Sequence, residues 1–143
     1  MKRTGSAVWS GGIKDGKGTL TTESETLSKT PYSLSARFKN AAGTNPEELI
    51  AAAHAGCFTM DLSGRLEARG MKAEEIRTMA TLEMDRTEKG FSITHIHLDV
   101  HARIPGGDAD IFRTEAFHAK ENCPVSRVLN NQPNVSEKAR QAI

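Results

Sequence analysis

The sequence predicts an α+β domain in which antiparallel sheets pack around a long central helix. Three observations support this fold class. Short alternating segments near the N-terminus predict strands, a capped apolar segment from Asn45 to about Gly70 predicts a long helix, and two alternating segments after Gly70 predict a hairpin. Because 143 residues suit one hydrophobic core, we expect a single domain spanning 1–143.

The N-terminal segments predict a small antiparallel sheet. Residues 7–9 and 18–22 are short strand-like runs separated by glycine-rich turn residues, which is typical of a hairpin. From Pro31 to Phe38 apolar and polar residues alternate, which predicts a third strand with Arg37 on its polar face. Alternation alone favours a solvated Arg37 without a function.

The central helix has the clearest start in the chain. Asn45 is a good N-cap, Pro46 suits the first helical position, and Glu48 completes the spacing of a capping box. Small residues cover much of the remaining circumference, so neighbours can approach from several sides. The predicted apolar stripe consists of Leu49, Ile50, Ala53, Cys57 and Met60.

Two longer alternating segments predict a second hairpin, with strands over about 76–84 and 96–104. The polar face of the second strand carries three histidines and an aspartate, which are residue types that bind transition metals. A solvated strand face collects such residues without any function, so we expect no metal site there. These residues are His95, His97, Asp99 and His101.

The C-terminal third predicts two helices. Asp108 or Asp110 can cap a helix that extends to about Glu121, and Pro124 suits the first turn of a short helix that follows Cys123. Amides at a helix start favour a thiolate, whereas burial favours the thiol. Residues 133–143 alternate poorly, and the sequence leaves their conformation open.

Charge and cysteine content exclude several classes of partner. Nineteen basic and eighteen acidic residues give a net charge of +1, so we expect no nucleic-acid partner. No segment has the length and apolarity of a membrane span, so we expect no membrane partner and a cytoplasmic location.

Cys57 and Cys123 are too few for a disulfide framework and too far apart for a CxxC motif. As isolated cysteines they suggest small buried thiols.

Several stretches together resemble the OsmC/Ohr family, named for osmotically inducible protein C and organic hydroperoxide resistance. They are GTNPEELI at 43–50, AAAHAGCF at 51–58 and CPVS at 123–126. Further similar runs extend the resemblance from Trp9 to Leu129, and TTES at 21–24 favours the OsmC branch. The tail from Gln132 departs from the alternating strand with which such proteins usually end.

The resemblance implies an intertwined homodimer, with long helices of both chains between two sheets and two active sites at the interface. It implies a cysteine-based peroxidase that needs no cofactor and reduces organic hydroperoxides, and hydrogen peroxide more weakly. In that scheme Cys57 is the peroxidatic thiol, Cys123 the resolving thiol, Arg37 the arginine of the site, and Glu47 the carboxylate that holds it. An external dithiol, lipoyl-type by family analogy, would regenerate the enzyme.

The chemistry of these residues fits the implied roles. Only a thiolate attacks a peroxide, and a free cysteine is mostly protonated at neutral pH, so Cys57 needs a nearby cation. Arg37 can supply that charge, and Glu47 can hold its guanidinium in a fixed orientation. An acidic residue such as Glu47 is also favoured in the first turn of any helix by the helix dipole.

Other classes of function remain open from the residues alone. His54 lies one turn before Cys57 and could act as its general base, as in a Cys/His hydrolase or transferase. The resemblance gives His54 no catalytic role. A non-catalytic redox-sensing or small-molecule-binding domain is a second alternative, and a metal bound by Cys57, Cys123 and His54 is a third.

Overall fold

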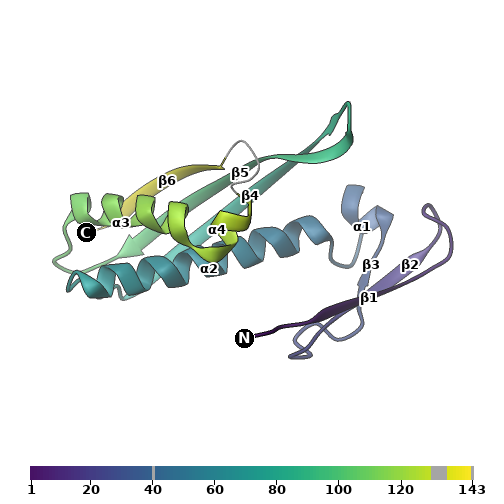
Figure 1. Ribbon diagram of the computed structural model, residues 1–143, viewed down its shortest axis with the longest axis horizontal. Helices are drawn as coiled ribbons and strands as arrows, with labels where there is room; N and C mark the ends of the chain where they lie inside the picture. Colours follow the sequence, from purple (N-terminus) through teal and green to yellow (C-terminus); the bar gives the residue numbers. More distant parts are fainter. Residues whose placement is uncertain (40, 130–134, 143) are drawn as a thin grey trace. The chain divides into compact units, whose positions relative to one another are not determined.

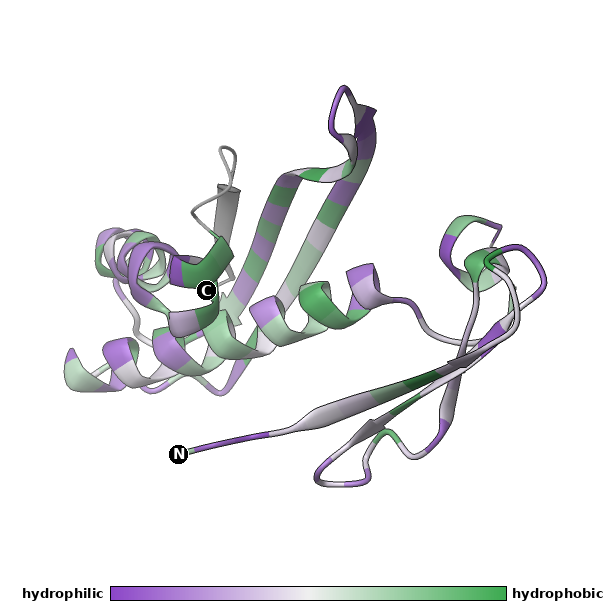
Figure 2. Cartoon of the chain, turned by 45° about the vertical axis from the view of Figure 1, so that its right-hand side comes forward, coloured by the Kyte–Doolittle hydropathy of each residue, from purple (hydrophilic) through white to green (hydrophobic). Residues whose placement is uncertain are grey.

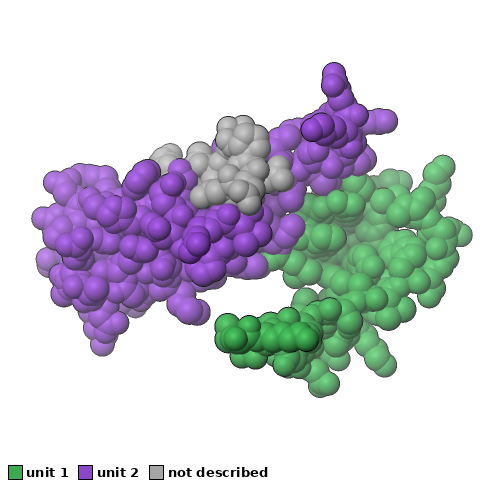
Figure 3. All heavy atoms as spheres, in the orientation of Figure 1, with its two compact units in different colours: residues 1–49 green, residues 50–143 purple. Residues whose placement is uncertain are grey.

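The computed structural model of the chain describes residues 1–39, 41–129 and 135–142 (Figure 1). The chain divides into two compact units, residues 1–49 and residues 50–143, which are described separately (Figure 3). The order of strands and helices confirms the α+β class that the sequence predicts.

The first unit contains a three-stranded antiparallel sheet in the order β1-β2-β3, formed by β1 Gly5–Ser10, β2 Lys17–Thr22 and β3 Thr30–Tyr32. The predicted hairpin is therefore confirmed. Gly18 faces the rings of Trp9 and Tyr32, whose centroids lie 5.3 Å apart. A Cβ atom at Gly18 would lie 2.2 Å from the Tyr32 ring, so only glycine fits between the two aromatics.

The prediction of a strand through Phe38 is wrong, because the chain turns into the short helix α1 Leu34–Phe38 after Tyr32. Ser33 caps this helix, and its Oγ accepts a hydrogen bond from the amide of Ala36 at 3.1 Å. A serine N-cap stabilises a helical turn locally, and five alternating residues are too few to outweigh it. Arg37 consequently lies in the last turn of α1 and not on a strand.

The long helix α2 Pro46–Ala68 begins in the first unit and continues into the second. Its predicted start is confirmed, since Asn45 Oδ1 accepts from the amide of Glu48 at 2.9 Å. The Glu48 carboxylate, however, accepts from the Thr44 hydroxyl. Gly70 follows the helix with a φ of +73°, which suits its predicted role as the C-terminal stop.

The predicted apolar stripe of α2 is wrong. Met60 is 77% exposed, and the buried face is instead His54, Phe58, Leu62 and Leu66. These four positions follow a strict four-residue step, and the large side chains of Phe58, Leu62 and Leu66 determine which face packs. The predicted stripe counts alanine and cysteine equally with larger apolar residues. These small side chains bury little apolar area, so they contribute less to the free energy of packing.

The second sheet consists of β4 Glu75–Thr87, β5 Gly90–Arg103 and β6 Val135–Ala142. Strands β4 and β5 pair in antiparallel fashion, which confirms the second hairpin, and hydrophobic and hydrophilic residues alternate along both (Figure 2). Strand β6 pairs with β5 in parallel, so this sheet is mixed and the poorly alternating tail is a strand over 135–142. Residues 133, 134 and 143 of the poorly alternating tail lie outside the described residues.

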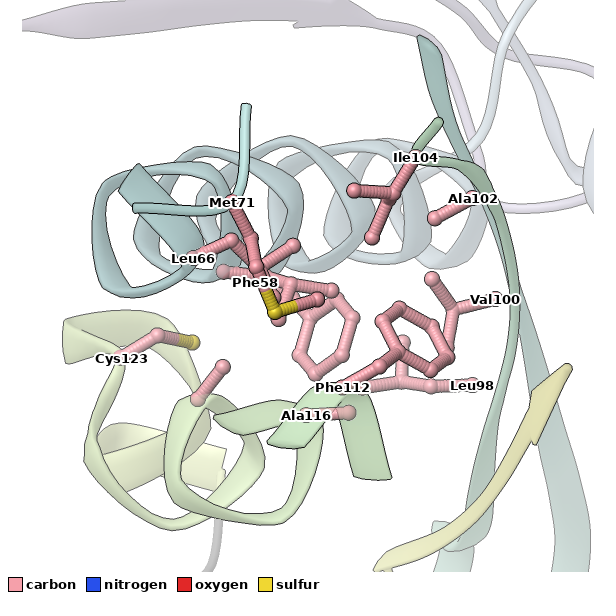
Figure 4. Packing of buried hydrophobic residues seen from close by; sticks show 12 residues of the cluster. Phe58, Leu66, Met71, Leu98, Val100, Ala102, Ile104, Phe112, Ala116 and Cys123 are labelled. Atoms are coloured by element: carbon pink, nitrogen blue, oxygen red, sulfur yellow. The ribbon is translucent and has the colours of Figure 1, made fainter. Parts of the chain in front are cut away.

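Helix α3 Ala109–Asn122 and helix α4 Pro124–Leu129 follow the hairpin. Asp108 is the N-cap of α3, since its Oδ1 accepts from the amides of Asp110 and Ile111. Side chains from α2, α3 and β5 form the core of the second unit, with the rings of Phe58 and Phe112 at its centre and Cys123 at its edge (Figure 4).

Candidate functional site

The two cysteines come together in the second unit. Cys57 lies half-buried in the middle of α2, and Cys123 is fully buried at the junction of α3 and α4. Both are free thiols. The Cys123 side chain and the backbone amide of Val125 both lie close enough to the Cys57 sulfur to shift its pKa. The fold thus places two thiols, far apart in sequence, within reach of one another.

The surroundings of Cys57 favour its neutral form. Burial raises the pKa of Cys57, and the neighbouring Cys123 and the negative charge of Asp61 raise it further. The amide of Val125 acts in the opposite direction and lowers the pKa, because it stabilises a negative sulfur. A reactive Cys57 thiolate therefore needs an additional positive charge.

Cys123 takes part in a second set of buried contacts. Its thiol donates to Ser126 Oγ at 2.9 Å, and its sulfur accepts from the Ser126 amide at 3.3 Å. Ser126 Oγ in turn lies 2.8 Å from His54 Nε2. All three side chains are fully buried. The imidazole of His54 is therefore linked to Cys123 through Ser126, whereas the groups that shift the pKa of Cys57 are Cys123, Val125 and Asp61.

Arg37 and Glu47 form an ion pair in the first unit. Arg37 Nε lies 3.0 Å and 3.1 Å from the two carboxylate oxygens of Glu47, and a second guanidinium nitrogen bonds to the nearer oxygen. The side chains are 35% and 16% exposed. The guanidinium also lies 5.3 Å from the centroid of the Phe38 ring, which stabilises the cation further. These contacts hold the guanidinium plane in one orientation.

A mainly apolar pocket of about 270 Å³ adjoins this ion pair in the first unit. Its lining combines aromatic and aliphatic side chains with the Arg37 side chain, so one wall carries a positive charge. Such a pocket suits an organic molecule with one polar end. The apolar lining residues are Trp9, Ile13, Tyr32, Leu34 and Pro46.

The structure thus brings the four predicted site residues together as two pairs, Arg37 with Glu47 in the first unit and Cys57 with Cys123 in the second. Sequence reasoning missed the contact between Ser126 and His54. Their positions differ by 72 in the sequence, and no local pattern links residues at that separation.

The described part of the chain lacks two further kinds of feature, a cluster of metal ligands and a membrane-spanning helix. Within residues 1–39, 41–129 and 135–142, no group of three or more His, Cys, Asp or Glu side chains could hold a metal ion. No helix in these ranges combines the length and the apolarity that a bilayer span requires.

Comparison with known proteins identifies the family. The sequence model of OsmC-like proteins matches residues 39–138. The chain is also 47% identical over 129 residues to the peroxiredoxin OsmC of Escherichia coli strain K12, covering 90% of both chains. The chain belongs to the OsmC-like family. This identity over nearly the whole length places it on the OsmC branch, as its TTES and GTNPEEL runs predict.

Solved structures agree with this OsmC-like assignment. An organic hydroperoxide resistance protein OsmC from Legionella pneumophila is 25% identical, with a TM-score of 0.70 and coverage of 98% of this chain and 97% of that one. An OsmC-like protein from Mycoplasma pneumoniae has a TM-score of 0.79 at 14% identity, covering 100% and 99% of the two chains, which shows a shared fold.

Proposed function

We propose that this OsmC-like chain is a thiol-dependent peroxidase that reduces organic hydroperoxides, and hydrogen peroxide more weakly. The pairing of the free thiols of Cys57 and Cys123 carries the proposal, because a peroxide-oxidised cysteine needs a second thiol beside it to form a disulfide. The family membership and the similarity to a peroxiredoxin support the same chemistry.

The first step is oxidation of Cys57. Its thiolate attacks one peroxide oxygen, the O–O bond breaks, and Cys57 becomes a sulfenic acid while the other oxygen leaves as an alcohol after taking up a proton. We propose that Arg37, oriented by Glu47, supplies the positive charge that the raised pKa of Cys57 requires and binds the peroxide oxygens. The apolar pocket beside Arg37 would accept the organic part of the substrate.

The second step is resolution by Cys123. The Cys123 sulfur attacks the Cys57 sulfur, the S–S bond forms, and the oxygen of the sulfenic acid leaves as water. An external dithiol then supplies two electrons and returns both cysteines to thiols. A lipoyl-type dithiol is the reductant that we propose by family analogy.

We further propose that both units belong to one OsmC-like domain and that the active form is a cytoplasmic homodimer with two active sites at its interface. A helix with exposed apolar residues supports a second copy packing on it, since Met60 of α2 is 77% exposed.

The Cys/His hydrolase alternative loses its geometric support, because His54 Nε2 bonds to Ser126.

The proposal predicts catalytic turnover. Reduced protein mixed with excess cumene hydroperoxide should consume many equivalents when a lipoyl-type dithiol is present and about one equivalent per site when it is absent, because the disulfide then accumulates. A redox sensor would consume a single equivalent under both conditions, and that result would contradict the peroxidase assignment.

A further inference from the structure

Three buried side chains of the second unit, beginning with the resolving thiol, are joined by hydrogen bonds. The Cys123 thiol donates to Ser126 Oγ at 2.9 Å, and Ser126 Oγ lies 2.8 Å from His54 Nε2. None of the three side chains has any exposed surface. These hydrogen bonds link α4 with α2, and neither step of the proposed peroxidase reaction uses them.

The presence of His54 at this place needs an explanation. Its Nδ1 is buried and has no hydrogen-bond partner among the described residues. A buried polar atom without a partner destabilises a protein, and an apolar side chain would fill the same space without that penalty. The other large buried residues on this face of α2 are Phe58, Leu62 and Leu66. A histidine among them is better explained by a chemical role than by packing.

The hydrogen bonds allow a proton to move in one direction, from Cys123 through Ser126 to His54. A hydroxyl carries one proton, so Ser126 can accept from the Cys123 thiol and donate its own proton to His54 Nε2. Burial lowers the pKa of His54, which keeps the imidazole neutral and able to accept. The Ser126 amide, 3.3 Å from the Cys123 sulfur, stabilises negative charge that develops there.

We infer that Ser126 and His54 form a proton relay that activates Cys123 for its attack on the Cys57 sulfenic acid. This inference rests on the peroxidase function proposed above. Ser126 contacts the reacting sulfur and is a catalytic residue, whereas His54 acts through Ser126 and is a positioning residue.

The relay accounts for each proton of the resolving step. The Cys123 proton passes to Ser126 Oγ while the Ser126 proton passes to His54 Nε2. The Cys123 sulfur bonds to the Cys57 sulfur, the S–O bond breaks, and hydroxide leaves with a solvent proton as water. When the external dithiol later reduces the disulfide and supplies both electrons, the Cys123 sulfur leaves and recovers its proton along the same path.

The test separates the two steps. Rapid mixing with cumene hydroperoxide, followed by acid quenching and intact-mass detection, gives the rate of Cys57 oxidation and the rate of disulfide formation. Ser126→Ala should oxidise at the wild-type rate but form the disulfide at least about tenfold more slowly, within the range of general acid–base catalysis. Ser126→Thr keeps the hydroxyl and should resolve more nearly like the wild type.

His54→Gln keeps a polar group near the position of Nε2 but cannot take up a proton. Disulfide formation in the wild type should be nearly independent of pH above the lowered pKa of His54. In His54→Gln it should rise with pH, because solvent must then remove the Cys123 proton. Two other titratable groups lie at the thiol pair, Cys57 itself and Asp61, whose charge raises the pKa of Cys57. Both remain in His54→Gln, so they do not account for a difference in pH profile between this variant and the wild type.

Thr59→Val is the matched control, since it removes a part-buried hydroxyl of α2 that bonds to Ala55 and Thr78. It should change neither rate. Wild-type disulfide formation in both Ser126→Ala and His54→Gln would overturn the relay, as would a pH profile of His54→Gln parallel to the wild type, even if the variants are less stable. Failure of Cys57 to oxidise in the unmodified protein would instead overturn the proposed function.

Discussion

Cys57→Ser should lower hydroperoxide turnover by at least about a thousandfold, the scale of loss when a covalent nucleophile is removed. The reason is that a serine hydroxyl is hardly ionised at neutral pH and cannot form a sulfenic acid. The substitution is close in size, and Cys57 is only half-buried, so the fold should tolerate it. Steady-state consumption of cumene hydroperoxide with saturating dithiol measures the loss.

Met60→Leu is the matched control for this variant. Met60 carries another sulfur of the same helix, and it lies where we propose that a second copy packs. Leucine has a similar volume and no sulfur. Met60→Leu should keep wild-type turnover if the thiol of Cys57 is the reacting sulfur. Comparable losses in both variants, or full activity in Cys57→Ser, would remove Cys57 from its role.

Arg37→Ala should slow oxidation of Cys57 by about a hundredfold or more, the scale of losing one charged group that stabilises a transition state. It should also raise the pKa of Cys57, which burial and Asp61 already raise, because a cation that favours the thiolate is lost. The rising limb of the oxidation rate should therefore move to higher pH. Ultraviolet titration of the thiolate and the pH dependence of the oxidation rate measure these two effects.

Arg77→Ala provides the control for loss of an arginine from an ion pair. Arg77 bonds to Glu75 at 2.9 Å on β4, and its side chain is 76% exposed. This variant should leave the thiolate titration unchanged.

Glu47→Gln should shift the titration in the same direction as Arg37→Ala but less, because the cation remains while its orientation is loosened. An unaltered titration in Arg37→Ala would rule out the proposed activation.

Local signals in the sequence were sufficient for several elements of the fold. The start of α2 follows from Asn45 and Pro46, because capping depends on residues adjacent in the chain. The hairpin of β4 and β5 follows from long alternation. The switch to helix after Tyr32 depends on one serine cap, which competes with an equally plausible alternating pattern.

Contacts between distant segments could not be predicted from residue patterns. The parallel pairing of β6 with β5 depends on tertiary structure, and the tail carries little alternation to indicate it. The proximity of Cys57 and Cys123 was implied only by the family resemblance. The bond between His54 and Ser126 had no sequence signal, since serine and histidine are common and CPVS does not indicate which residue the serine contacts.

Cys57 and Cys123 should form an intramolecular disulfide during hydroperoxide reduction. The most direct measurement treats the reduced protein with one equivalent of cumene hydroperoxide and combines non-reducing peptide mapping with the mass of the intact, denatured chain. Cys123→Ser is the control. We expect one Cys57–Cys123 disulfide within a single chain, and in Cys123→Ser a Cys57 that gains an oxygen atom without forming that bond. A stable sulfenic acid in the unmodified protein, or a disulfide of the same mass in Cys123→Ser, would contradict it.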